Sequence, residues 1–139
     1  MIVALASAWN PRGELARFER LYPLLKAAYS HLVITLPPQV DLELVTALQA
    51  AERVRPVVTP QWPVGRFLAL RTALETGAEY IHYADFDRLL RWVETRRSEW
   101  QQTVEAVTRA DCLVIGRTEK AWATHPRALR ETEAISNQV

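Results

Sequence analysis

The stretch that decides the fold is residues 80–87, which read Tyr-Ile-His-Tyr-Ala-Asp-Phe-Asp. A mostly apolar run ends in two carboxylates, Asp85 and Asp87, and open α/β sheets bind ligands where such strands end. Alternate residues of an extended segment point the same way. We therefore expect both carboxylates to face one ligand and to attract a hard cation, Mg²⁺ or Mn²⁺. The plainer interpretation is a polar strand exit followed by a helix N-cap.

Strand-like and helix-like segments alternate along the whole chain, which predicts an α/β domain with a mainly parallel sheet and helices on both faces. The five expected strands are residues 2–6, 31–36, 54–59, 80–84 and 112–116. Pro56 cannot donate a ladder hydrogen bond, so the third strand belongs at an edge. The prediction is a Rossmann-like sheet of about five strands with order 3-2-1-4 in its N-terminal part, and a ligand site between strands 1 and 4.

The helix expected before the fourth strand, residues 66–76, carries two arginines and ends near Gly77. A helix start that presents backbone amides and Arg66 suits an anionic ligand, and Arg71 follows about one and a half turns later. The simpler interpretation is that both arginines are solvated. The apolar face of this helix is expected to consist of Phe67, Leu70 and Leu74. A last helix is expected to open at Pro126.

Composition indicates one domain with a real core, since 49% of the 139 residues are hydrophobic. Seventeen basic and sixteen acidic residues give no argument for a nucleic-acid or anionic-membrane partner. The apolar N-terminus lacks a cationic flank, so we interpret it as a first strand in a cytoplasmic protein, and no apolar run is long enough for a transmembrane segment. The lone Cys112 is expected to pack in the core. Neither G-x-G-x-x-G nor a P-loop occurs.

Three segments together resemble the N-terminal, donor-binding half of GT-A-fold glycosyltransferases. They are Ser7-Ala8-Trp9-Asn10 at the end of the first strand, the helix 65–74, and the strand with its D-x-D motif at 80–87. The resemblance implies that the chain binds a nucleotide-sugar donor. It implies that Ser7, Trp9 and Asn10, at the end of the first strand, contact this donor, and that Trp9 and Asn10 lie at its nucleotide base. It further implies that Arg66 and Arg71 assist near the nucleotide, that Asp85 meets the ribose and the metal, and that Asp87 binds the Mg²⁺ or Mn²⁺.

The resemblance spans nearly all of residues 1–139 but only the donor-binding half of such enzymes. We therefore interpret the chain as a single GT-A-like domain truncated at its C-terminus, with no identified catalytic base and an unknown acceptor. The later carboxylates, Glu119, Glu131 and Glu133, are interpreted as solvated charges, and His125 as a helix cap.

Two alternatives from other classes stay open. One is a non-catalytic nucleotide-binding or interaction domain of the same fold. The other is a haloacid-dehalogenase-like phosphatase, because residues 81–90 also resemble that family's D-x-D strand, with Asp85 as nucleophile and Asp87 as general acid. That family opens its domain with this strand and needs a later lysine, for which the sequence offers only Lys120.

Overall fold

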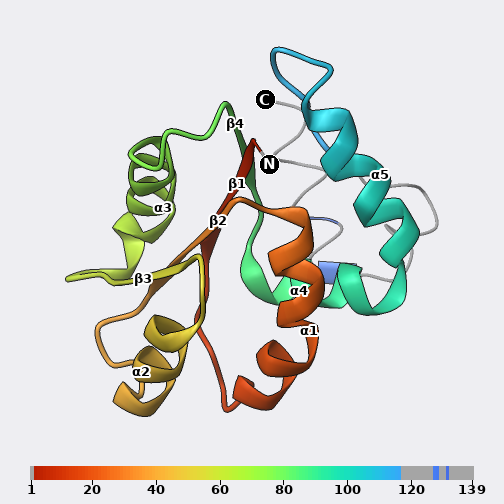
Figure 1. Ribbon diagram of the computed structural model, residues 1–139. Helices are drawn as coiled ribbons and strands as arrows, with labels where there is room; N and C mark the ends of the chain where they lie inside the picture. The colour runs from red at the N-terminus through yellow and green to blue at the C-terminus, as the bar shows by residue number, and fades with distance from the viewer. Residues whose placement is uncertain (1, 117–126, 129–130, 132–139) are drawn as a thin grey trace.

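The computed structural model describes residues 2–116, 127, 128 and 131, and these form an α/β domain (Figure 1). The strands are β1 (Val3–Ala8), β2 (His31–Leu36), β3 (Val54–Val58) and β4 (Tyr80–Tyr83). The helices are α1 (Leu15–Ala28), α2 (Leu42–Ala50), the 3₁₀ turn η1 (Trp62–Val64), α3 (Gly65–Leu74), α4 (Phe86–Thr95) and α5 (Arg97–Val107). None of these helices is long and apolar enough to cross a membrane.

The four strands form one all-parallel sheet in the order β3-β2-β1-β4, which confirms the predicted order. Every residue of β1 is buried, as its uninterrupted run of apolar and small side chains predicts for a central parallel strand. Pro56 lies in β3 at the edge, where its missing N–H leaves no ladder bond unmade. The sheet therefore brings the ends of β1 and β4 together.

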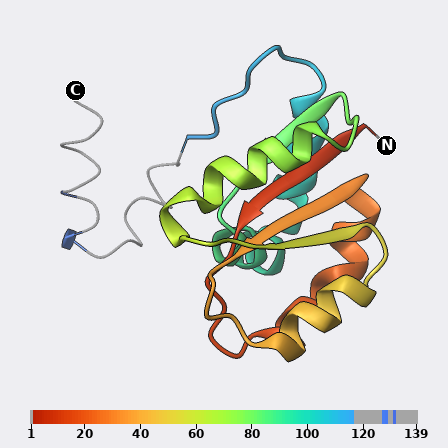
Figure 2. The same ribbon diagram turned by 90° about the vertical axis from the view of Figure 1, so that its left-hand side faces the viewer.

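The two faces of the sheet are covered unequally (Figures 1 and 2). Helix α3 lies across one face, where Ala69 and Ala73 pack against Ala6 and Val33. The other face carries the main core, to which α1, α2, α4 and α5 all contribute side chains. Its largest fully buried members include Trp9, Tyr29, Phe86 and Trp100.

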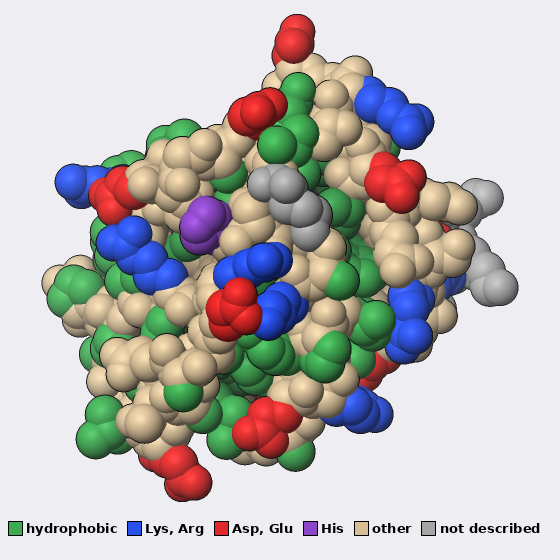
Figure 3. Space-filling model, viewed as in Figure 1, with side chains coloured by type: hydrophobic (Ala, Val, Ile, Leu, Met, Phe, Trp, Pro, Cys, Tyr) green, Lys and Arg blue, Asp and Glu red, His purple; other side chains and the backbone are tan. Residues whose placement is uncertain are grey.

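The buried face of α3 differs from the predicted one. Its buried residues are small, namely Gly65, Ala69, Thr72 and Ala73. The expected apolar stripe is exposed instead, with 64% of Phe67 and 70% of Leu74 accessible. The reason is close packing: the alanines let the helix lie close to Ala6 and Val33 of the sheet, which larger residues would prevent. Hydrophobic side chains thus remain at the surface among interspersed acidic and basic groups, as they also do on the face seen in Figure 3.

The prediction of a fifth strand at 112–116 is not met, because this stretch has no strand structure and all its residues are exposed. Cys112 is exposed as well, so its predicted core position is wrong. The run has strand propensity, but propensity becomes structure only through hydrogen bonds to a neighbouring strand and packing. Glu119, Lys120, His125, Pro126 and Glu133 lie outside the described residues, as does most of the predicted last helix.

Candidate functional site

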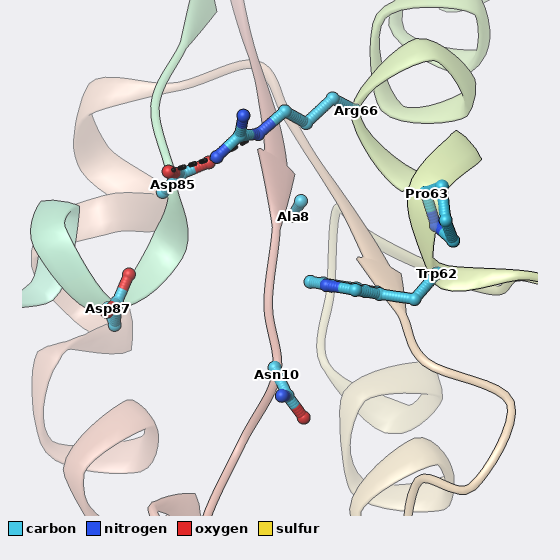
Figure 4. A pocket seen from close by; sticks show the side chains of 7 residues that line it. All are labelled: Ala8, Asn10, Trp62, Pro63, Arg66, Asp85 and Asp87. Carbon is cyan, nitrogen blue, oxygen red and sulfur yellow. Dashed lines mark hydrogen bonds and ion pairs between the residues drawn. The ribbon is translucent and has the colours of Figure 1, made fainter. Parts of the chain in front are cut away.

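A pocket of about 370 Å³ opens at the carboxyl ends of β1 and β4, where the strand order of the sheet reverses (Figure 4). Parallel sheets characteristically bind ligands at this position. The pocket is lined by Ala8, Asn10, Trp62, Pro63, Arg66, Asp85 and Asp87. The segments after β1, β3 and β4 thus all contribute to one cavity.

The two aspartates of the D-x-D motif both line this pocket, but not as alternate residues of one extended segment. Asp85 has extended backbone angles and precedes α4, whereas Asp87 lies in the first turn of that helix. Phe86 between them points into the core, where its ring lies 4.8 Å from that of Trp9 and 6.1 Å from that of Phe18. The buried ring anchors the helix start, and the two carboxylates stay at the surface beside it.

Asp85 is already engaged by two neighbours. Arg66 of α3 donates from Nη2 to Oδ2 at 2.9 Å and from Nε to Oδ1 at 3.3 Å. The hydroxyl of Tyr83 donates to Oδ1 at 2.7 Å. The side chain of Asp85 therefore makes no N-cap hydrogen bond to α4. The dashed lines in Figure 4 show the arginine reaching across from α3.

Charges, hydrogen bonds and burial keep Arg66 and Tyr83, the two partners of Asp85, protonated. The hydrogen bond and charge of Asp85 raise the pKa of Arg66. Burial, followed by the hydrogen bond to Asp85, raises the pKa of Tyr83. At neutral pH Arg66 is therefore charged and Tyr83 is a neutral donor. Because 70% of the Arg66 side chain is exposed, solvent screens this ion pair and a competing charge can reach it.

Two of the predicted donor contacts, Ser7 and Trp9, are buried and do not line the pocket. Ser7 is fully buried, and its hydroxyl donates to the carbonyl of Ala84 at 2.6 Å, which ties β1 to the end of β4. Trp9 is 1% exposed and packs against Phe18 and Phe86. Its Nε1 is buried without a hydrogen-bond partner among the described residues. This burial argues against the predicted contact of the Trp9 ring with a nucleotide base.

Of the other predicted site residues, four line the pocket and one does not. Asn10, Arg66, Asp85 and Asp87 come together in the pocket. Arg71 is exposed in the last turn of α3 and does not line the pocket, because five residues along a helix turn it away from Arg66.

Sequence reasoning assigned no role to Trp62 and Pro63, which form the pocket wall opposite the carboxylates. A signal was present: an aromatic residue followed by proline stands between the third strand and the start of α3. In a parallel sheet such a segment lies at the ligand-binding edge. Trp62 is 38% exposed, in contrast to the buried Trp9.

The pocket offers a divalent cation two carboxylates. Within the described residues no group of three or more His, Cys, Asp or Glu side chains is placed to hold a metal ion. Carboxylate oxygens suit Mg²⁺ or Mn²⁺, which retain water and phosphate oxygens as their remaining ligands. A cation in this pocket would have the carboxylates of Asp85 and Asp87 in its lining, and Asp85 would first have to be released from Arg66.

Comparisons with protein-family models, with curated proteins and with solved structures gave no match to this chain.

Proposed function

We propose that the chain binds a nucleotide-diphospho-sugar donor, in the manner of the donor-binding half of the GT-A glycosyltransferases that its sequence resembles. The observation that carries the proposal is the pocket itself. Asn10, Arg66, Asp85 and Asp87 were selected from three separate segments of the sequence and line one cavity at the reversal point of the sheet. Such an arrangement combines acidic metal ligands with a cation suited to phosphate.

The Arg66–Asp85 ion pair gives this proposal a definite binding step. The pair is solvent-exposed and involves one residue from each side of the pocket. Asp85 and Asp87 would hold Mg²⁺ or Mn²⁺, and Arg66, once released from Asp85, would be free to pair with the diphosphate. The metal would supply Lewis-acid stabilisation of the phosphate oxygens of the leaving group. Arg66 would add positive charge at the same place.

We also propose that this sheet is the N-terminal part of a GT-A fold. An all-parallel sheet in the order 3-2-1-4, with its pocket beside strands 1 and 4, is compatible with the N-terminal part of a GT-A sheet. In that arrangement a further strand would follow β4. Donor binding draws on groups that line the pocket, whereas glycosyl transfer also needs an oriented acceptor and commonly a base.

The experiment is to incubate residues 1–139 with a panel of UDP-, GDP- and dTDP-sugars, with and without simple sugar acceptors, and to measure release of nucleoside diphosphate. We expect slow, metal-dependent hydrolysis of one donor class and little transfer, since correct positioning of reactants accounts for roughly 7 to 11 kcal/mol of barrier lowering. Binding without any release would favour the non-catalytic domain. Binding of no nucleotide sugar would refute the proposal.

A further inference from the structure

The pocket has two chemically different walls. In Figure 4 the carboxylates of Asp85 and Asp87 lie on one side, and the indole ring of Trp62 extends from the other side toward the chain between Ala8 and Asn10. Among the described residues, the other tryptophans do not line this pocket: Trp9 and Trp100 are buried, and Trp92 is packed against the main core. Trp62 therefore supplies the aromatic surface of this site.

The ring of Trp62 is held in place by its own loop. A Cβ built on Gly65 would lie 3.5 Å from Cζ3 and 3.6 Å from Cε3 of the indole, so the ring edge rests against the start of α3. Pro63 follows directly and restricts the backbone of η1. A ring fixed in this way loses little conformational freedom when a ligand stacks on it, which favours binding.

We propose that Trp62 is the stacking platform for the nucleobase of a nucleoside diphosphate, an inference that rests on the proposed donor site. The base lies on the indole, and its diphosphate extends toward Arg66 and the aspartates. The side-chain amide of Asn10 offers both a donor and an acceptor to the edge of the base. Every base has a π-face, so Trp62 contributes affinity while Asn10 contributes selectivity among bases.

The test compares ligands with and without a base. Dissociation constants of UDP, GDP and inorganic pyrophosphate are measured by calorimetry in Mg²⁺ for the wild-type chain and for Trp62→Ala, Trp62→Phe and Phe67→Ala. Stacking on one aromatic ring predicts about 5- to 150-fold weaker binding of UDP or GDP by Trp62→Ala, with pyrophosphate unchanged. Trp62→Phe should retain most of the affinity. Phe67 is exposed on the adjoining helix α3 outside the pocket, so Phe67→Ala is the matched control and should bind like wild type.

Three results would overturn the inference. If wild type binds UDP or GDP and Trp62→Ala binds it equally well, the base lies elsewhere although the donor site stands. If Trp62→Ala loses pyrophosphate as strongly as UDP, Trp62 supports the loop and does not stack on a base. If wild type binds neither nucleoside diphosphates nor pyrophosphate, the proposed function itself fails. Quenching of tryptophan fluorescence by bound UDP gives a second readout, which Trp62→Phe should largely abolish while keeping its affinity.

Discussion

Acidification should destabilise this fold through one buried histidine, His82 of β4. The side chain is 3% exposed, and burial lowers its pKa to about 4. Its Nδ1 lies 2.7 Å from the hydroxyl of Tyr29, which also accepts a hydrogen bond from Nε1 of Trp100 at 3.0 Å. With this hydroxyl accepting from Trp100, its own O–H is placed to donate a hydrogen bond to Nδ1 of a neutral His82 that carries its proton on Nε2. That Nε2 is buried without a partner among the described residues.

The sign and size of the effect follow from these contacts. An unfolded chain binds a proton at His82 below about pH 6.5, whereas the folded chain binds it only below about pH 4. Between these values the unfolded state holds more protons, so stability falls as the pH falls. Each pH unit corresponds to about 1.4 kcal/mol, which makes the total loss roughly 3 kcal/mol. The loss begins near pH 6.5 and levels off below pH 4.

The assay is urea denaturation at a series of pH values from 7.5 to 4, for wild type, His82→Phe and His31→Gln. The His82→Phe variant has a lower stability at neutral pH because Tyr29 loses its acceptor, but it should lack this part of the pH dependence. The half-buried His31 is the matched control, and its variant should follow wild type. The reasoning is refuted if the stability difference between wild type and His82→Phe does not change between pH 6.5 and 4.5.

Three further changes have defined outcomes. Arg66→Gln should weaken binding of UDP in Mg²⁺ about 10- to 150-fold, as expected for loss of a charged hydrogen bond. The affinity of Arg71→Gln, measured in the same way by calorimetry, should stay within about twofold of wild type. Equal losses in the two variants would contradict binding of UDP in this pocket. Gly65→Ala should raise the free energy of unfolding by up to about 1 kcal/mol, since φ is −56° and a methyl group would meet only ordinary contacts; a loss in urea denaturation would count against it. Phe86→Ala should lower stability by about 3 to 5 kcal/mol through loss of a fully buried ring, and a loss below about 1 kcal/mol would show that Phe86 is no anchor.

Much of the sheet could be predicted because each strand can be recognised from its own residues. The run of apolar and small residues in β1 indicates a central strand and the proline in β3 indicates an edge strand, and the structure has both as expected. The prediction failed where packing against other segments determines the structure. The apolar run at 112–116 and the buried face of α3 depend on what packs against them, and periodicity alone does not supply that information.

The pocket, too, could be predicted only in part from the sequence. Asn10, Asp85 and Asp87 follow from the rule that parallel strands present ligand groups at their carboxyl ends, and Arg66 follows from the suitability of a helix start for an anion. Trp9 stands beside Asn10 in the sequence, yet its ring packs in the core. Trp62, to which sequence reasoning assigned no role, lines the pocket because the segment after β3 reaches the same edge, a proximity that only the assembled sheet reveals.

The central claim is that Asp85 and Asp87 bind a donor diphosphate through a divalent cation, and the metal dependence of nucleotide binding tests it most directly. Calorimetry with UDP and GDP in Mn²⁺, in Mg²⁺ and in excess chelator should show binding only with metal. Loss of one charged ligand in Asp87→Asn should cost on the order of 1 to 3 kcal/mol, which is about 5- to 150-fold in affinity. The exposed Asp111 lies outside the pocket, so Asp111→Asn should bind like wild type. Equal binding in excess chelator, or equal affinity of Asp87→Asn and wild type, would contradict the claim.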